Sequence, residues 1–350
     1  MASTSRLIAT SVLALALYAG ACNDSTSPPA VNPAAMATAV NAFSTTFTGN
    51  AAFQSLSALS SAFTLSAAPV RPAAPLPASG APWLASVAAE MSLMRGLVGR
   101  APSAIQALFR ANVLGKTFQW DTAGGGRYRI TDSTLSGASS NGVRFFLYVV
   151  IPGSARPLVP LQKIGTVDLV DVSTPQANIL HTVLQFGTQT ISDYTITGVK
   201  TTSSLTLTAA GYITDGVTQT TFTLQHALTL ADSSLVTDFQ LSASGATVAM
   251  HTTLTGSGGR NAAIDWIVQK GGSIEVVGTS TPSTINVQFK FNGTTWATVS
   301  GSPAAPTIAG APGQSLTTGD LLALAEILQG FGDISANLEG VFGPAFLVFK

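Results

Sequence analysis

Three histidines are the side chains of this sequence best suited to proton transfer or metal binding. His181, His226 and His251 fall in separate segments, and none has a Cys, Asp or Glu at the spacing of a metal-ligand pair. His251 alternates with Thr253 on a polar face, whereas His226 shares its face with apolar residues. We therefore expect His226 to be a buried histidine satisfied by one hydrogen bond, and we expect no metal ion and no cofactor.

The acidic residues form no simple pair for general acid–base catalysis. Asp168 and Asp171 are three residues apart, an odd step along a strand, so they should lie on opposite faces. The other acidic residues in the predicted strands each stand alone among apolar or hydroxyl neighbours, so we expect them to be solvated strand positions. They are Asp193, Asp238, Asp265 and Glu275.

Motifs of nucleophilic, metal-dependent or phosphate-binding enzymes are also missing. The sequence contains no G-x-S-x-G, H-E-x-x-H or G-x-x-x-x-G-K-[ST]. We therefore expect a protein that is not an enzyme. A hydrolase whose site is assembled from distant strands stays an alternative, since one sequence does not reveal which strand residues converge.

The single cysteine, Cys22, indicates the compartment. Arg6 is followed by the apolar stretch 7–18, which is too short to span a bilayer, and then by the small residues of 19–21. This order resembles the lipobox signal of bacterial lipoproteins, although Ala19 stands where the lipobox usually has Leu. Cleavage by the ordinary signal peptidase is the alternative.

The resemblance implies that residues 1–21 are a signal peptide and that Cys22 carries lipid. The protein would then be attached to a membrane of the cell envelope. Residues 22–33 are rich in Ser, Pro and Asn, which is typical of a flexible tether. Asn23 replaces the aspartate that in some bacteria signals retention in the inner membrane, so we expect the outer membrane, facing the periplasm or the surface.

Composition limits the partners. Lys plus Arg and Asp plus Glu number 16 each, and removal of a leader whose only charge is Arg6 leaves 15 against 16, a net charge of −1. Because phosphate neutralisation requires a basic excess or a basic face, we expect no nucleic acid partner. Charged residues are 9% of the chain and apolar residues 46%, so a large core can form.

The segment 34–116 has helical periodicity. Met36, Val40 and Phe43 recur at spacings of four and three residues, as expected for one face of a helix. The Pro/Ala-rich segment 67–82 interrupts this region, and because proline removes backbone donors we expect an extended linker there.

From residue 117 to residue 300 the period changes to two, with turn residues such as Asn292-Gly293 between the strands. Apolar Leu205 and Leu207 alternate with threonines, so one face should be dry and the other wet. The segment 143–151 is apolar on both sides, which predicts a central strand covered on both faces. The turns between these strands are short, and short connections favour antiparallel neighbours.

The chain after residue 300 predicts a linker, 301–315, and then a terminal helix. We expect Thr318 to cap this helix, Asp320 to lie in its first turn and Gly330 to follow its end. The predicted fold is therefore α+β and mainly β, a large antiparallel meander sheet with a helical N-terminal region and a C-terminal helix. The sheet would be either a sandwich or a half-barrel.

The dry face of this sheet suggests a function. Its expected ligand-facing residues are Phe222, Leu224, His226, Leu228 and Leu230. If the helices leave a gap, the architecture resembles the half-barrel carriers of lipid and lipoprotein in the envelope, and the partner is an apolar small molecule or an envelope protein. A structural or adhesive surface protein and an outer-membrane β-barrel are the alternatives.

Overall fold

The computed structural model describes most of the chain from residue 107 onward and two helical segments before it. The described residues are 33–48, 94–95, 107–123, 126–130, 137–150, 156–243, 245–256, 261–303, 305–313 and 315–349. Cys22, the tether and the Pro/Ala-rich segment 67–82 lie outside the described residues, so the predictions made for them stay predictions.

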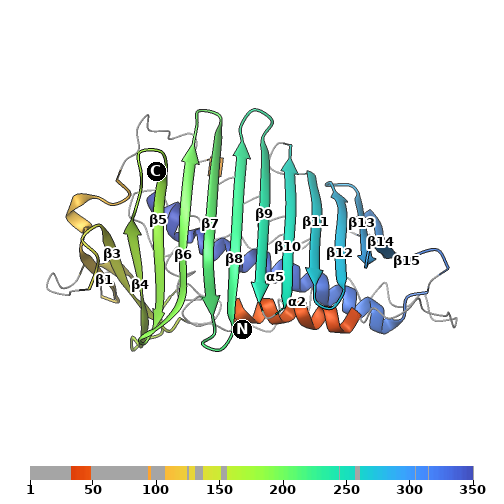
Figure 1. Cartoon of the computed structure of the whole chain (residues 1–350), viewed down its shortest axis with the longest axis horizontal. Coiled ribbons are helices and arrows are strands. Elements are labelled where there is room, and N and C mark those ends of the chain that lie inside the picture. The colour runs from red at the N-terminus through yellow and green to blue at the C-terminus, as the bar shows by residue number, and fades with distance from the viewer. Residues whose placement is uncertain are drawn as a thin grey trace.

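One open sheet of fifteen strands dominates the described residues (Figure 1). The strands are β1 (Lys116–Asp121), β2 (Arg127–Arg129), β3 (Gly142–Tyr148), β4 (Lys163–Asp171), β5 (Asn178–Phe186), β6 (Gln189–Lys200), β7 (Ser204–Thr214), β8 (Gln219–Thr229), β9 (Ser234–Ala243), β10 (Ala246–Thr255), β11 (Asn261–Gln269), β12 (Ser273–Ser280), β13 (Ile285–Phe291), β14 (Thr294–Ser302) and β15 (Ala305–Gly310). From β3 to β15 consecutive strands pair antiparallel, while β1 pairs parallel with β3 and antiparallel with β2. The predicted mainly β, antiparallel meander is confirmed, as a single open sheet and not a sandwich.

Alternation of side chains gives the sheet two different faces. Leu205, Leu207 and Ile213 are buried on one face, which we call the inner face, while threonines between them point to the opposite, outer face. Asn292 and Gly293 join β13 to β14 with φ values of +46° and +80°. Both values lie in the left-handed region that a two-residue hairpin turn requires, as the sequence predicts.

Helices cover only the inner face within the described part of the chain. They are α2 (Pro33–Thr48) and α5 (Thr318–Val348), while the short 3₁₀ turn η2 (Ala111–Val113) precedes β1 and has no buried residue. Figure 1 shows α5 crossing the strands obliquely, with α2 beside it, and α2 packs mainly against α5 and also reaches β11. In the described segments, no helix combines the length and the apolar character that a membrane crossing requires.

The terminal helix differs from its prediction at both ends. Thr317, not Thr318, is the N-cap: its hydroxyl accepts a hydrogen bond from the Asp320 N–H, and the Asp320 carboxylate accepts one from the Thr317 N–H. The helix does not end before Gly330 but continues to Val348. Gly330 is buried inside it because α2 approaches the helix closely at that point.

The predicted linker 301–315 is also wrong in part. β14 extends to Ser302, and residues 305–310 form β15, which pairs antiparallel with β14 along its whole length. Pro306 is tolerated because it lies opposite Gly301, at a pair that exchanges no backbone hydrogen bonds. Pairing with an existing strand thus overrides the low strand propensity of Pro, Ala and Gly.

The apolar segment 143–151 is not a central strand with a layer on each face. β3 is the third strand from the edge of the sheet. Its inner-face residues, Val143 and Phe145, are buried, but its outer face carries Arg144 and Phe146. The Lys163 ammonium lies 3.5 Å from the centroid of the Phe146 ring, so a long polar side chain covers that ring where we expected a second layer.

Candidate functional site

Three of the residues predicted to face a ligand lie on the inner face, beneath α5. Phe222, Leu224 and Leu228 of β8 have exposed fractions of 4%, 2% and 0%. Leu230 does not share this position, because β8 ends at Thr229 and Leu230 is in the following turn, where it is exposed. The apolar inner face of β8 is therefore covered by the protein's own helix.

His226 is buried on the same inner face, and its predicted hydrogen bond is present. Its Nδ1 lies 2.9 Å from the Thr237 hydroxyl, and its ring centroid is 4.6 Å from that of Phe342 in α5. The prediction of a buried, hydrogen-bonded histidine is confirmed. Thr237 was not predicted as its partner, since only the pairing of β8 with β9 brings the two side chains together.

Further contacts fix α5 to the sheet on either side of His226. The Trp266 ring packs against Phe331 with centroids 5.2 Å apart, and the Trp266 indole N–H donates to the Thr252 hydroxyl at 3.0 Å. The Tyr194 hydroxyl donates to the carbonyl oxygen of Val341 at 3.2 Å. Because these groups are buried, each hydrogen bond removes a desolvation cost that would otherwise weaken the packing.

The outer face contains two histidine–aspartate pairs. His181 Nε2 lies 2.7 Å from Asp193 Oδ1, and His251 Nδ1 lies 2.6 Å from Asp238 Oδ1. The expectation that these aspartates stand alone is therefore wrong. His251 and Asp238 are directly opposite each other on β10 and β9, so their symmetric positions about the turn at Gly245 are the sequence signal that could have revealed the pair.

His251 also contacts a hydroxyl, so that a carboxylate, an imidazole and a hydroxyl are linked in a row. Its Nε2 lies 3.2 Å from Thr253 Oγ1. However, the His251 and Asp238 side chains are 50% and 52% exposed, so water competes for both bonds. A nucleophilic site needs preorganised donors in a water-excluded setting, and an open sheet face does not supply that setting.

Two further ion pairs lie on the outer face. Arg144 binds Asp168 with two hydrogen bonds of 2.5 and 2.6 Å, and this bonding raises the pKa of the Arg144 guanidinium. Lys290 Nζ lies 2.7 Å from Glu275 Oε1, so the expectation that Glu275 stands alone is wrong. Asp171 points away from Asp168 and accepts the Leu108 N–H, which confirms their opposite faces.

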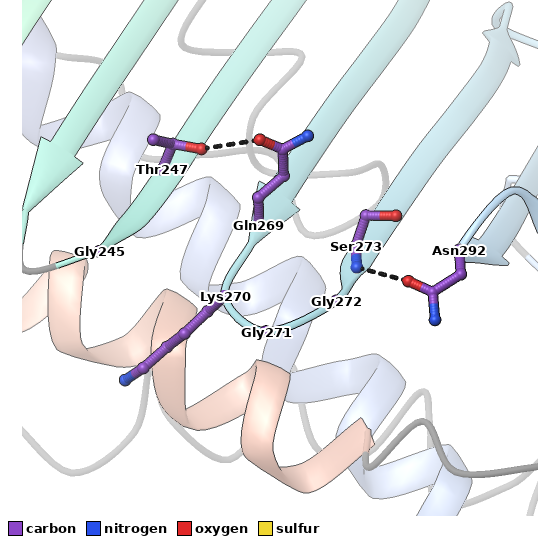
Figure 2. A pocket seen from close by; sticks show the side chains of 8 residues that line it. All are labelled: Gly245, Thr247, Gln269, Lys270, Gly271, Gly272, Ser273 and Asn292. Carbon is purple, nitrogen blue, oxygen red and sulfur yellow. Dashed lines mark hydrogen bonds between the residues drawn. The ribbon is translucent and has the colours of Figure 1, made fainter.

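No group of three His, Cys, Asp or Glu side chains among the described residues is placed to hold a metal ion. A polar depression of about 330 Å³ lies instead where three hairpins end, at the turns β9–β10, β11–β12 and β13–β14. Its lining residues are Gly245, Thr247, Gln269, Lys270, Gly271, Gly272, Ser273 and Asn292 (Figure 2). We call it the hairpin-end depression.

Two hydrogen bonds order the side chains of the hairpin-end depression. The Thr247 hydroxyl donates to Gln269 Oε1 at 3.2 Å, and the backbone N–H of Ser273 donates to Asn292 Oδ1 at 2.8 Å (Figure 2). Sequence patterns indicated Asn292 as a turn residue only. The gathering of the lining residues in one place follows from the meander, which stacks alternate turns at the same end of the sheet.

The fold and these sites define a class of protein: an open, mostly antiparallel sheet that carries helices on its inner face and a polar, hydrogen-bonding outer face. No protein-family model matches the chain, and neither the curated proteins nor the solved structures contain a match.

Proposed function

We propose that this chain is a lipoprotein of the cell envelope that acts as a binding protein, and that it contacts its partner through the outer face of the sheet. The observation that carries the proposal is the difference between the two faces. In the described structure α2 and α5 cover the inner face, while the same strands expose polar side chains on the outer face (Figure 1).

The chemistry of the outer face suits a polar partner. Thr223 and Gln225 of β8 are exposed next to Asp238 and Gln240 of β9. Hydroxyls and carboxamides donate and accept hydrogen bonds without the desolvation cost of a charge. Since Arg144 is paired with Asp168 and Lys290 with Glu275, this surface favours a partner rich in hydrogen-bonding groups over a strongly charged one.

The inner face supports binding of an apolar molecule less well. Phe222, Leu224 and Leu228 are already buried, and α5 supplies the side chains that cover that face. An apolar ligand would have to displace α5 and expose Phe331 and Phe342, each of which has an exposed fraction of 0%. That exposure would cost several kcal/mol, because burial of one large apolar side chain contributes about 1.5–3 kcal/mol.

Site-specific photocrosslinking tests the proposal. A photoreactive amino acid is placed at Thr223 or Gln240 on the outer face, and as a control at Leu322 of α5, which is 53% exposed. Each variant is expressed in a diderm bacterium and irradiated in cells. We expect crosslinked products from Thr223 and Gln240 and none from Leu322.

Three results would argue against this function. Crosslinking from Leu322 alone would place the contact on the helical side of the molecule. If none of the three positions gives a product while thermal melts show that every variant is folded, the outer face is not a contact surface. Co-purification of a lipid with the wild-type protein, as seen by native mass spectrometry, would favour the carrier function instead.

A further inference from the structure

We propose that the hairpin-end depression binds an oxyanion, the carboxylate or phosphate group of a larger envelope molecule. The inference rests on the proposed binding function and names the chemical group recognised at one end of the outer face. Gln269, Lys270 and Asn292 are the residues that supply its donors.

The orientation of the two carboxamides is the first argument. Gln269 Oε1 accepts the Thr247 hydroxyl, and Asn292 Oδ1 accepts the Ser273 N–H. Each amide oxygen is thus held by a bond within the protein, and this leaves each NH₂ group directed away from that bond (Figure 2). The depression therefore presents two amide donors, and donors are what an oxyanion needs.

Charge is the second argument. Lys270 is the only charged residue in the lining, so the lining has a formal charge of +1. The closest acidic residue along β12 is Glu275, and Lys290 neutralises it at 2.7 Å. Within the described residues no carboxylate lies within salt-bridge distance of the Lys270 ammonium, so that ammonium can pair with an incoming anion.

The accessible backbone of the glycine turns is the third argument. Gly271 has a φ of +67°, and a Cβ built on it would meet no atom within 4 Å. A Cβ built on Gly245, in the β9–β10 turn, would likewise meet no atom within 4 Å. A ligand can therefore approach the turn without a side chain in its way.

Lys270 must move to complete the site. In Figure 2 its side chain extends away from Gln269 and Asn292. The side chain is exposed and has four methylene groups, so rotation about its torsions can bring the ammonium over the depression. Ordering it costs up to about 2 kcal/mol of rotamer entropy, so we expect weak binding of a small anion and stronger binding of a polymer that makes further contacts.

The test uses isosteric variants that keep the internal bonds. Gln269→Glu and Asn292→Asp retain an oxygen for Thr247 and for Ser273, but each replaces the NH₂ donor with a negatively charged acceptor. Gln219→Glu is the matched control, since it adds the same charge at an exposed position of β8 outside the lining. Calorimetry and NMR titration of the purified protein use inorganic phosphate, galacturonate and, as a neutral probe, galactose.

We expect phosphate and galacturonate to shift the amide signals of Gly271 and Gly272, and galactose to leave them unchanged. Gln269→Glu and Asn292→Asp should each weaken anion binding by at least about tenfold, the loss of one charge-assisted hydrogen bond, while Gln219→Glu should keep wild-type affinity. A response to only one of the two anions identifies which group is recognised.

An equal loss of binding in Gln219→Glu would show that the general charge of the face, and not this site, attracts anions. Absence of any anion response in a folded wild-type protein would overturn the inference. The two proposals can fail separately. If anion binding is absent but crosslinking from Thr223 and Gln240 persists, the outer face still binds a partner. If both are absent, both proposals are wrong.

Discussion

Gly330 of α5 lies so close to Val40 of α2 that a Cβ built on it would be 2.3 Å from Val40 Cγ1. The two helices therefore contact each other at a point where only hydrogen fits. Gly330→Ala should push α2 away or distort α5, and overpacking of this kind costs about 1–3 kcal/mol. Denaturant unfolding measures the loss.

Gly332 provides the matched control two residues further along the same helix. A Cβ on Gly332 would meet no atom within 4 Å, so Gly332→Ala adds only helix propensity. We expect it to stabilise the protein by about 0.5–1 kcal/mol. Equal effects of the two substitutions would show that α2 and α5 do not pack as described.

The buried phenol of Tyr194 should make the fold sensitive to alkaline pH. Burial raises the pKa of Tyr194 well above its ordinary value of 10.0, so the folded state keeps the phenol protonated. Below pH 10 both states bind this proton and stability is unaffected. Above pH 10 the unfolded state releases it first, so stability falls by up to about 1.4 kcal/mol per pH unit for each such group.

Tyr194→Phe separates this effect from general alkaline damage. The variant loses the hydrogen bond to the Val341 carbonyl, which should cost about 1 kcal/mol at neutral pH. Its decline in stability above pH 10 should nevertheless be shallower than that of the wild type. Thermal melts from pH 8 to pH 11 give both values, and an unchanged slope would contradict the burial of the phenol.

Pro306 should keep the edge strand β15 from pairing with another molecule. The Ala311 N–H donates to Trp296 of β14, so by alternation residue 306 faces the open edge, where proline offers no donor. Pro306→Val restores that donor and should increase self-association, measured by analytical ultracentrifugation. Thr307→Val, whose N–H faces β14, should stay at the wild-type level; association of both variants would indicate an effect of hydrophobicity alone.

Lipid attachment at Cys22 is a prediction from the leader sequence. In a diderm host, Cys22→Ala should lose membrane association and accumulate as soluble or unprocessed protein, whereas Ser25→Ala should behave as the wild type. Mass spectrometry of the N-terminal peptide checks for the lipid directly. Membrane pelleting of Cys22→Ala, together with a wild-type peptide that carries no lipid, would disprove the anchor.

The sequence predicted those parts of the fold that depend on local patterns. Alternation at Leu205 and Leu207 indicated the correct buried face, and Asn292-Gly293 indicated a hairpin turn, because both signals come from a few adjacent residues. His226 was correctly expected to be buried and hydrogen-bonded, since its apolar neighbours on β8 show the environment of that face.

Features that depend on distant partners could not be predicted in this way. Gly330 signals a helix end locally, but the approach of Val40 makes glycine necessary inside the helix. The bond between His251 and Asp238 requires the register of β9 and β10, and β15 requires β14 to pair with it. The hairpin-end depression gathers residues from three turns, so no single stretch of sequence reveals it.

The pairing of each strand from β3 to β15 with its neighbours in sequence makes the sheet modular in one dimension. Most paired strands are joined by short loops, so the sheet can assemble by adding one hairpin after another. Such local pairing favours rapid folding for a β protein. Removal of two consecutive strands, such as β9 and β10, would leave β8 and β11 in the correct antiparallel orientation to pair. The width of the outer face can thus change by whole hairpins during evolution, whereas α5 must change its length to match.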